Sequence, residues 1–458
     1  MKPMSSAFRA ISAILILAAV SLPSEARTRP RWGGRAVIEL REASTEIDPR
    51  SERTSAGMRQ QIAPLVFESL TRTDTSGAVQ PGLAASWTRV HSTRWTFTLR
   101  GGALFSDGTA VTASQVAGSI GGQLRDAKIS AQDASTVVID TPQPWENLPA
   151  ILSFPRFSIV KDNGPLPIGS GPYKIGDWQP GRGIVLTRNG EYDGPAPYLE
   201  TIEVRFKENA GSTFAVNGID LNEIGLEQAR SLGANSGKRS DDASELYVLR
   251  WNDGVRIDDR VRKAMAAAID RASLALPFSR DGATPAAGYL PQSVSGYEFL
   301  FEQKPDVTQA RALVRDAGWR LPLPIAYRAS DPVARLIAER IAVNAREAGL
   351  NVQPLGEKDP FGTTAAVARI VRLPVTETSP AASLFDIAAN LGLASGGVLG
   401  DDDAGRLLTV ERDLLNDTRS IPLLHVPAII WQSRRLHDVD SAGDWQLGSA
   451  WVSAGVSP

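Results

Sequence analysis

The sequence predicts an α/β protein that folds in more than one domain. In its second half, a helix expected to begin at Asp306 is followed by a strand at Leu323–Tyr327 and by a second helix that begins at Asp331. The chain has 458 residues, which is too long for one compact core and indicates two or three domains. A hydrophobic content of 42% and a charged content of 22% are ordinary for a globular protein.

Residues 1–26 have the features of a secretory signal peptide. Lys2 and Arg9 give a positively charged start, residues 10–22 are apolar, and residues 24–26 offer small side chains around a cleavage point after Ala26. The apolar run is shorter than the roughly 20 residues that a membrane span needs, so an uncleaved anchor is the weaker alternative. We therefore expect the chain to be exported.

The first half of the chain alternates short strands with turns. Ala36–Leu40 is an apolar run of strand length that opens into a polar loop ending at Pro49. Leu83–Trp87 is expected to form a single helical turn. Apolar residues alternate with polar ones over 95–100, which is the period of a half-buried strand. Further strands are expected at 136–140, 198–206, 248–252 and 421–424.

Capping residues mark where helices begin. Thr112, with Gln115 three positions later, forms a capping box for a helix at about 112–122. Asp258, Asp306 and Asp331 each precede an apolar pattern of helical spacing, so their carboxylates are expected to accept the first free backbone N–H groups. These helices place most of the predicted α content in the second half of the chain.

The sequence predicts no catalytic site, metal site or cofactor. It has no cysteine, which excludes disulfides, thiolate metal ligands, a cysteine nucleophile and a lipid-modified N-terminal cysteine. Its three histidines, His91, His425 and His437, are not at metal-ligand spacing. Ser158 and Lys161 have the spacing of an SxxK motif, but its companion motifs are absent. A net charge of −2 without a Lys/Arg block argues against a nucleic-acid surface.

Residues 81–116 carry motifs in a fixed order and spacing. They are Pro81, Leu83, Ala84, Ser86, Trp87, Trp95, Phe97, Leu99, Arg100, Gly102, Phe105, Asp107, Gly108, Thr109, Thr112, Ala113 and Val116. This run resembles the bacterial extracellular solute-binding proteins of family 5, the peptide, opine and nickel class, which feed ABC importers. One departure is Gln115, where the family usually has Asp.

Three other stretches support the same resemblance. Residues 169–175, Gly-Ser-Gly-Pro-Tyr-Lys-Ile, match the family's GPY motif. Residues 258–271, with their Arg-Val-Arg and Ala-Ile-Asp-Arg runs, match the family's helix in the second lobe. Ile47-Asp48-Pro49 stands where the family's first strand leads to a cleft loop.

The resemblance implies a two-lobed α/β periplasmic-binding-protein fold, class II of cluster C type, with an extra inserted domain. Lobe I would comprise residues 33–63, 166–250 and 419–458, the inserted domain residues 64–165, and lobe II residues 251–418. The hinge would be crossed near Gly169–Gly171, Val248–Asn252 and Ile421–Leu424.

The resemblance also implies a function and a site. The chain would be an exported, monomeric, periplasmic binding protein of an ABC import system. It would capture a peptide or another small polar solute between its lobes and deliver it to membrane permease subunits, without enzymatic activity. From their place at the lobe edges, the candidate ligand contacts are Glu42, Ser44, Thr45, Trp251, Asn252 and Asp253.

The resemblance fades over residues 354–418. Family members that bind peptides usually carry an aromatic-rich acidic element there, and this chain has an Ala/Gly-rich stretch instead. The alternative interpretation is a diverged, non-transporting periplasmic sensor or accessory protein of the same fold. An exported hydrolase is a third and weaker hypothesis, because no nucleophile–base pair is evident.

Overall fold

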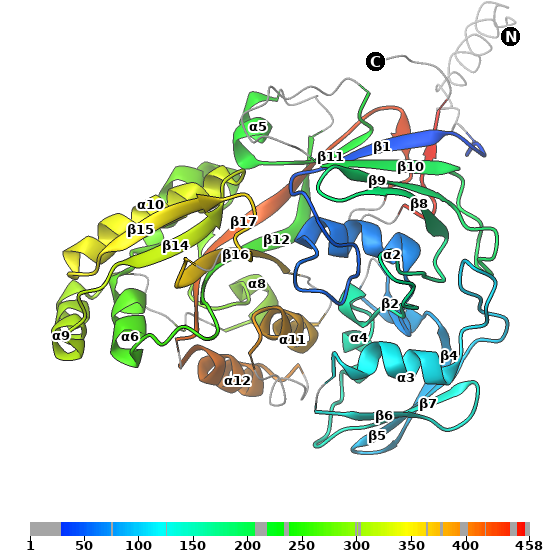
Figure 1. The fold of residues 1–458 in the computed structure, drawn as a ribbon, viewed down its shortest axis with the longest axis horizontal. Helices are drawn as coiled ribbons and strands as arrows, with labels where there is room; N and C mark the ends of the chain where they lie inside the picture. Colours follow the sequence, from blue (N-terminus) through cyan, green and yellow to red (C-terminus); the bar gives the residue numbers. More distant parts are fainter. Residues whose placement is uncertain are drawn as a thin grey trace, which may run out of the picture.

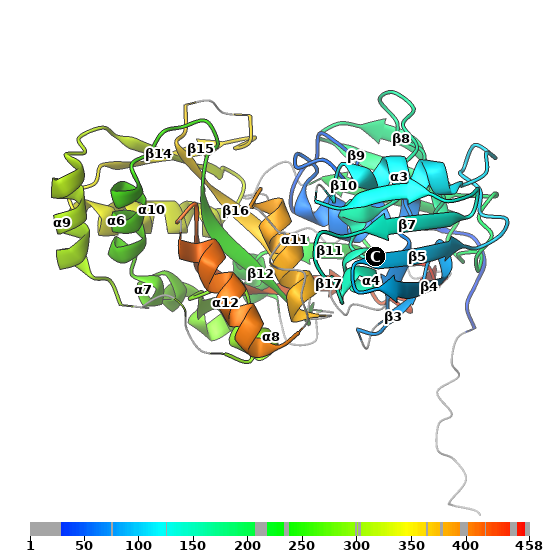
Figure 2. The same cartoon turned by 90° about the horizontal axis from the view of Figure 1, so that it is seen from below.

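The computed structural model describes residues 29–74, 77–124, 126–206, 218–232, 238–297, 300, 304–362, 365–375, 379–393, 402–416, 418–439 and 447–453. For Glu227 and residues 238–244 it describes the backbone alone. The predicted signal peptide lies outside these ranges. Two bodies lie side by side, and they are joined where the long strands β12 (Lys238–Trp251) and β17 (Ser420–Gln432) run between them (Figures 1 and 2).

One mixed sheet runs through both bodies. Its described strands lie in the order β15-β14-β16-β12-β17-β11-β1-β10-β9-β8, and β13 pairs with β17. β1 is parallel to β10 and β11, and β14 is parallel to β15 and β16. The bounds are β1 Arg35–Leu40, β8 Tyr173–Gln179, β9 Gly183–Arg188, β10 Thr201–Phe206, β11 Leu221–Ile224, β13 Thr284–Pro285, β14 Leu323–Arg328, β15 Val352–Glu357 and β16 Ala368–Val375.

The first body packs its part of the sheet against a short helical segment. The predicted strand at 36–40 is confirmed as β1, whose Ile38 and Leu40 are fully buried. The helical segment consists of η1 (Met58–Ile62, a π-helix) and α2 (Ala63–Val66), and its Met58 and Ile62 belong to the same core. A two-stranded sheet of β18 (Leu436–His437) and β19 (Trp451–Val452) adds Leu436 and Val452 to this core.

A separate four-stranded sheet lies beside the first body, in the order β4-β5-β7-β6 (Figure 2). The predicted strands at 95–100 and 136–140 are confirmed as β5 (Arg94–Leu99) and β7 (Thr136–Asp140). Helix α3 (Ala113–Gly121) begins with the predicted capping box of Thr112 and Gln115. The remaining elements of this region are β2 Thr71–Thr73, β3 Val79–Pro81, β4 Ala84–His91, β6 Lys128–Ala131, α4 Leu148–Ile151 and the 3-10 helix η2 Pro155–Phe157.

The helical turn predicted at Leu83–Trp87 is wrong. Ala84–Trp87 form the start of β4, which pairs antiparallel with β5. Trp87 lies opposite Phe97, and their rings stack with centroids 6.4 Å apart. The cross-strand pairing and this ring contact outweigh the helical preference of Leu83-Ala84-Ala85, because strand preference depends on packing with neighbours.

The second body is rich in helices and contains the predicted strand–helix–strand unit. Parallel strands β14 and β15 are connected by α10 (Pro332–Glu347), which begins at Asp331 as predicted. The predicted caps Asp258 and Asp306 also accept backbone N–H groups, at α6 and α9. The other helices are α5 Leu226–Ser231, α6 Asp259–Ala268, α7 Arg271–Ala275, η3 Leu276–Asp281, α8 Gln292–Ser295, α9 Val307–Ala317, α11 Pro380–Asn390 and α12 Ala404–Asn416.

The predicted hinge segments lie in different surroundings. Val248–Trp251 and Ile421–Leu424 belong to β12 and β17, the strands that run between the two bodies. Gly169 and Gly171 instead pack against the backbone of α2. A Cβ atom at Gly169 would lie 1.9 Å from the Val66 carbonyl oxygen, so this motif is needed for close backbone approach.

Candidate functional site

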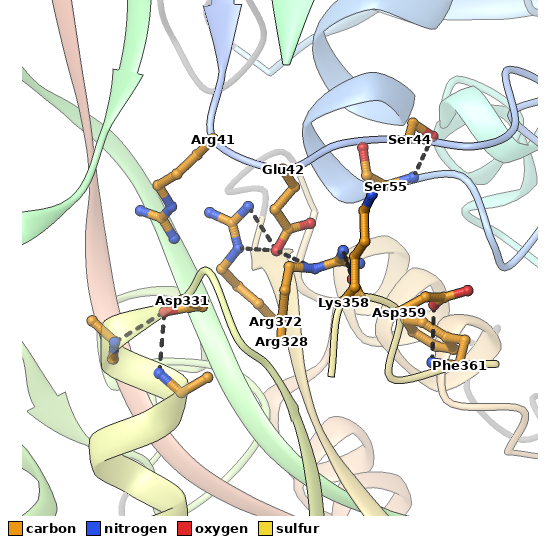
Figure 3. Close-up of polar contacts among 12 residues, drawn as sticks. Arg41, Glu42, Ser44, Ser55, Arg328, Asp331, Lys358, Asp359, Phe361 and Arg372 are labelled. Carbon is orange, nitrogen blue, oxygen red and sulfur yellow. Dashed lines mark hydrogen bonds and ion pairs between the residues drawn. The ribbon is translucent and has the colours of Figure 1, made fainter. Parts of the chain in front are cut away.

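A small cavity lies where the segment after β1 faces the second body (Figure 3). One wall comes from residues 42–60, and the other comes from β16, the start of α10, the turn at 360–361 and the end of α11. The cavity volume is about 60 Å³. Both bodies therefore contribute to one small space, lined by charged and apolar side chains, that has room for only a few waters.

Glu42 reaches across the cavity to arginines of the second body. Its carboxylate lies 3.2 Å from the Arg372 guanidinium and 3.7 Å from that of Arg328 (Figure 3). Arg328 also donates to the Lys358 carbonyl at 3.1 Å, which keeps its side chain directed at the cavity. Glu42 lies two residues after the end of β1, so the strand end limits where this carboxylate can lie.

Arg372 is the centre of a buried charge network. It is paired with Glu42, with Glu223 of β11 at 2.9 Å and with Glu245 of β12. Arg41 adds a second cation, with its guanidinium 3.2 Å from Glu245. In such a network each buried charge has a partner of opposite sign, and a buried charge without one is very unfavourable. Removal of one member therefore leaves others unpaired.

The charges around Glu42 favour the ionised form of its carboxyl group. Burial opposes ionisation of this carboxyl, but Arg372 and Arg328 outweigh burial and hold the pKa of Glu42 below its usual value. Glu245 behaves differently, because burial is dominant there and raises the pKa of its carboxyl. The pKa of Arg372 is raised well above its usual value despite burial, because three carboxylates surround it.

Asp331 connects the network to helix α10. Its Oδ1 accepts from the backbone N–H groups of Val333 and Ala334, at 3.0 and 3.1 Å, as an N-cap. Its Oδ2 accepts from the Tyr247 hydroxyl at 3.0 Å, and that hydroxyl in turn accepts from Arg41. The start of α10 is thereby placed against the crossing strand β12.

Arg59 closes the other end of the cavity. Its guanidinium donates to the carbonyls of Pro49, Ser51 and Thr54 and, at 2.7 Å, to the side chain of Asn390 at the end of α11. Burial, together with the nearby Arg156, lowers the pKa of Arg59 to about 10. The bond to Asn390 is a second link between the two bodies.

Of the residues predicted as ligand contacts, Glu42 alone lines the cavity. Ser44 is buried; its hydroxyl donates to the Glu46 carbonyl at 2.6 Å and accepts from the backbone N–H of the cavity residue Ser55 at 3.1 Å. Thr45, the next residue, is exposed. The role of all three in ligand binding stays a prediction.

The other three predicted contacts lie at the end of β12, outside the cavity lining. Trp251 is buried in the core of the second body. Asn252 donates to the Ala366 carbonyl at 2.8 Å, and Asp253 is exposed and paired with Arg250 and Arg419. Their role as ligand contacts also stays a prediction.

Sequence reasoning missed Arg328, Arg372 and Tyr247. The available indication was a charged residue inside the apolar run Ile370–Leu373, because a cation in a buried strand needs partners. The sequence does not indicate that those partners come from the segment after β1 and from β11 and β12, which are more than a hundred residues away along the chain.

The described residues contain no group of three or more His, Cys, Asp or Glu side chains that could hold a metal ion. In the same part of the chain, no helix combines the length and the apolar character needed to cross a membrane.

Comparison with known proteins identifies the fold. The structure superposes on AgaA from A. tumefacien R10 in complex with agropinic acid, with a TM-score of 0.77 and 17% identity over 93% of this chain and 100% of that one. It also superposes on NikA from Staphylococcus aureus, with a TM-score of 0.75 and 18% identity over 92% of this chain and 100% of that one. The predicted two-lobed α/β fold of periplasmic binding proteins is confirmed.

The family follows from sequence. Residues 78–369, more than half of the chain, match the model of the bacterial extracellular solute-binding proteins, family 5 middle region. The chain therefore belongs to this family, as its motifs predicted.

The sequence relatives match only part of this chain. Protein XP55 of Streptomyces lividans is 27% identical over 339 residues, which are 64% of this chain and 62% of that protein. The periplasmic murein peptide-binding protein MppA of Escherichia coli K12 is 24% identical over 380 residues, 69% of this chain and 70% of that protein. A probable peptide ABC transporter periplasmic-binding protein of Sinorhizobium fredii is 32% identical over 199 residues, 38% of this chain and 37% of that protein. The chain thus spans less than two thirds of the length of the first of these relatives.

Proposed function

We propose that this chain is the exported substrate-binding protein of an ABC import system, which captures a peptide or another small polar solute between its two lobes and delivers it to a membrane permease. The observation that carries the proposal is the pairing of Glu42, from one lobe, with Arg328 and Arg372 of the other across a small cavity. Family membership supports the same function.

The charges in the cavity favour a ligand with an acidic group. The Glu42 carboxylate lies between the two guanidinium groups. A ligand carboxylate that entered between the separated lobes would find the same pair of cations, and arginine binds carboxylates with strong, charge-assisted hydrogen bonds. Glu42 would then act as an internal stand-in for the ligand's acidic group.

The ligand must enter an open form. A cavity of about 60 Å³ is far below the roughly 300 Å³ at which ligand pockets begin, so a peptide cannot bind without separation of the lobes. Closure would bring both lobes into contact with the ligand. The ligand favours the closed form only to the extent that this form binds it more tightly than the open form does.

The same proposal includes a location in the cell and a partner. A cleaved signal peptide at residues 1–26 would deliver the mature chain to the periplasm, where it would act as a monomer and dock on ABC permease subunits in the inner membrane. It would bind its solute without chemical turnover. The alternative is a non-transporting sensor or accessory protein, which the departure over residues 354–418 favours.

The first test is native mass spectrometry of the mature protein purified from a periplasm without denaturation. We expect an added mass that is lost on unfolding. In a thermal-shift series, tripeptides with a free C-terminal carboxylate should stabilise the protein, and a ligand at a hundred times its dissociation constant contributes about 2.7 kcal/mol. The same peptides with an amidated C-terminus provide the matched control.

Further probes come from the relatives: glutathione, murein tripeptide, agropinic acid and nickel–histidine complexes. Equal stabilisation by the free and amidated peptides would contradict the acidic-group assignment while leaving solute binding intact. An apo mass together with no stabilisation by any probe would contradict solute capture and favour the non-transporting alternative.

A further inference from the structure

Helix α11 lies on the side of the second body that faces the first (Figures 1 and 2). Its residues 381–388 are all buried, as expected for a helix that is packed on several sides. It packs on β16 of its own lobe and on α4 beside the first body. Phe385 of α11 also stacks on Phe157 of η2, with ring centroids 5.8 Å apart. Separation of the lobes must therefore break contacts of this helix.

A buried ion pair lies in the same interface. The Asp386 carboxylate of α11 is 3.8 Å from the Arg156 guanidinium of η2, and each residue is 5% exposed. At this distance the two groups attract each other without a direct hydrogen bond. Among the described residues, the Arg156 Nε has no hydrogen-bond partner. A buried guanidinium is thus compensated only weakly, which is unfavourable in surroundings from which water is excluded.

Arg59 is a second buried cation on the lobe I side of this interface. It lies on η1, which packs against η2, and Arg156 is close enough to contribute to the lowered pKa of Arg59. Across the interface, Arg59 donates at 2.7 Å to Asn390, a neutral amide of α11. Asn390 in turn donates to the Asp386 carboxylate at 2.9 Å. Lobe II therefore offers these two arginines one amide and the carboxylate of Asp386.

Asp386 is a poor counter-charge for the two arginines. Burial raises the pKa of its carboxyl, although Arg156 and Arg59 act in the opposite direction. The carboxyl is therefore harder to ionise here than in water. A solute carboxylate that formed direct hydrogen bonds to the guanidinium groups would compensate them better than Asp386 does.

The arrangement is the reverse of the one around Glu42. There, a carboxylate of lobe I lies between arginines of lobe II. Here, an acid of lobe II lies beside arginines of the lobe I side. Arg59 and Asn390 line the cavity between the lobes, whereas Arg156 and Asp386 lie outside its lining, in the interface that α11 covers. Lobe separation would leave each wall with arginines that have lost an acid of the other lobe.

We propose that the captured solute carries two acidic groups, one for each end of the cavity. One group binds Arg328 and Arg372. The other replaces Asp386 beside Arg59 and Arg156. This inference rests on the proposed function and narrows the solute class to dicarboxylates and to peptides with an acidic side chain and a free C-terminus. Arg156 is the residue that discriminates between solutes with two acidic groups and those with one.

The test compares solutes that differ in one acidic group, by isothermal titration calorimetry of the mature protein after dialysis. One series is succinate, glutarate, adipate, pimelate and suberate beside their monoamides. The other is the tripeptides Glu-Ala-Ala, Ala-Glu-Ala and Ala-Ala-Glu beside the same peptides with Gln in place of Glu. We expect the best solute with two acidic groups to bind about tenfold more tightly than its partner, the difference that one charge-assisted hydrogen bond provides.

Asp386→Asn tests whether this residue competes with the solute. The amide can still contact Arg156 but carries no charge, so a solute carboxylate displaces it more easily. Affinity for solutes with two acidic groups should rise about tenfold, while affinity for their partners with one acidic group should stay the same. A residue that only held the lobes together would not produce this selective gain.

Arg156→Met tests the proposed anchor. The variant should bind both members of each matched pair equally, at the affinity of the solute with one acidic group. Arg89→Met is the matched control, because Arg89 lies on β4, is paired with Glu146 and should leave the preference unaltered. Asp386→Asn decides the question if Arg156→Met fails to fold.

Three results would overturn this inference and leave solute capture intact. They are equal affinities for the matched solutes in both series, a preference that Arg156→Met retains, and an Asp386→Asn variant that binds no more tightly than the unaltered protein. If no solute of either series bound, the proposed function itself would be contradicted, and this inference with it.

Discussion

At the residue scale, Glu411 is the most unusual carboxyl outside the charge network. It is fully buried in α12, and its hydrogen-bond donors are the backbone N–H groups of Tyr289 and Leu290 and the Tyr297 hydroxyl. Burial raises its pKa to about 7 from 4.5. The folded state therefore prefers the protonated acid, and this contribution to stability is complete below pH 4.5 and is lost as the pH rises through about 7.

Glu411→Gln should remove this pH dependence. The amide cannot ionise, so the stability difference between the variant and the unaltered protein should change by on the order of 3 kcal/mol between pH 4.5 and pH 8. Urea unfolding at a series of pH values measures it. Glu339→Gln, at an exposed position on α10, is the control and should show no such change. An equal difference at both ends of the pH range would contradict the assignment.

Arg372 shows how one buried cation can stabilise several carboxylates. Arg372→Leu would leave Glu42, Glu223 and Glu245 without their shared partner. Removal of one member of a buried ion pair typically costs about 3–5 kcal/mol. We expect a loss of that size in the free energy of unfolding at pH 7, measured by urea titration.

The control for Arg372 lies on α10. Arg335→Leu removes an arginine that is 62% exposed and paired with Glu339, and it should change stability by less than about 0.5 kcal/mol. Similar losses in the two variants would mean that the network around Arg372 contributes no more than a surface ion pair.

At the element scale, the Gly169–Gly171 segment shows where backbone contacts are tightest. A Cβ at Gly169 would lie 1.9 Å from the Val66 carbonyl oxygen, so either this segment or α2 must move when a side chain is added. Gly169→Ala should therefore cost about 1–3 kcal/mol, the usual range for overpacking. Thermal unfolding measures it.

Gly190→Ala is the matched control for this prediction. A Cβ at Gly190 would meet no atom within 4 Å, so the same change should leave the melting temperature nearly unaltered. If both variants melted at the same temperature, α2 would be able to move away from the added side chain at no cost in stability. The close approach would then not stabilise the fold.

The elements also show what could be predicted from the sequence and why. Asp258, Asp306 and Asp331 were predicted as caps correctly because capping is local and acts over three residues. The start of β4 was predicted as a helical turn because its pairing with β5 and the contact of Trp87 with Phe97 are not local.

The candidate site was less predictable for the same reason. Glu42 could be placed at a lobe edge because the family resemblance puts the loop after the first strand at the cleft, and Glu42 lies two residues after β1. Its partner Arg372 lies 330 residues away along the chain, and sequence patterns do not record which distant residues meet. Prediction of the cavity needed the sheet order. In that order β12 and β17 lie between β16 on one side and β11 and β1 on the other.

At the scale of the whole molecule, the closed arrangement depends on bonds that opening must break. Glu42 pairs with Arg328 and Arg372, and Arg59 donates to Asn390 at 2.7 Å. These contacts join residues 42–59 of one lobe to β14, β16 and α11 of the other. Figure 3 shows the two pairs that Glu42 makes. The ligand-free protein should therefore be mostly closed, which small-angle X-ray scattering can measure as a small radius of gyration.

Glu42→Gln should shift the ligand-free protein toward the open form, because it removes the anion shared by two arginines across the cavity. We expect a larger radius of gyration than for the unaltered protein. Glu52→Gln is the matched control, since Glu52 lines the same cavity but is exposed. Identical scattering from Glu42→Gln and the unaltered protein would show that closure does not depend on this pair.

The pH dependence of closure follows from the same carboxylate. Arg372 and Arg328 hold the pKa of Glu42 below 4.5 against the effect of burial. A group with a lowered pKa in the folded, closed state contributes its full stabilisation above the ordinary pKa and loses it as the pH falls through the lowered value. The unaltered protein should therefore stay closed from neutral pH down to pH 4.5 and open only in more acidic solution, whereas Glu42→Gln should show the same radius of gyration throughout. Opening that began above pH 4.5 would assign closure to another group, of which Glu245, with its raised pKa, is the first to test.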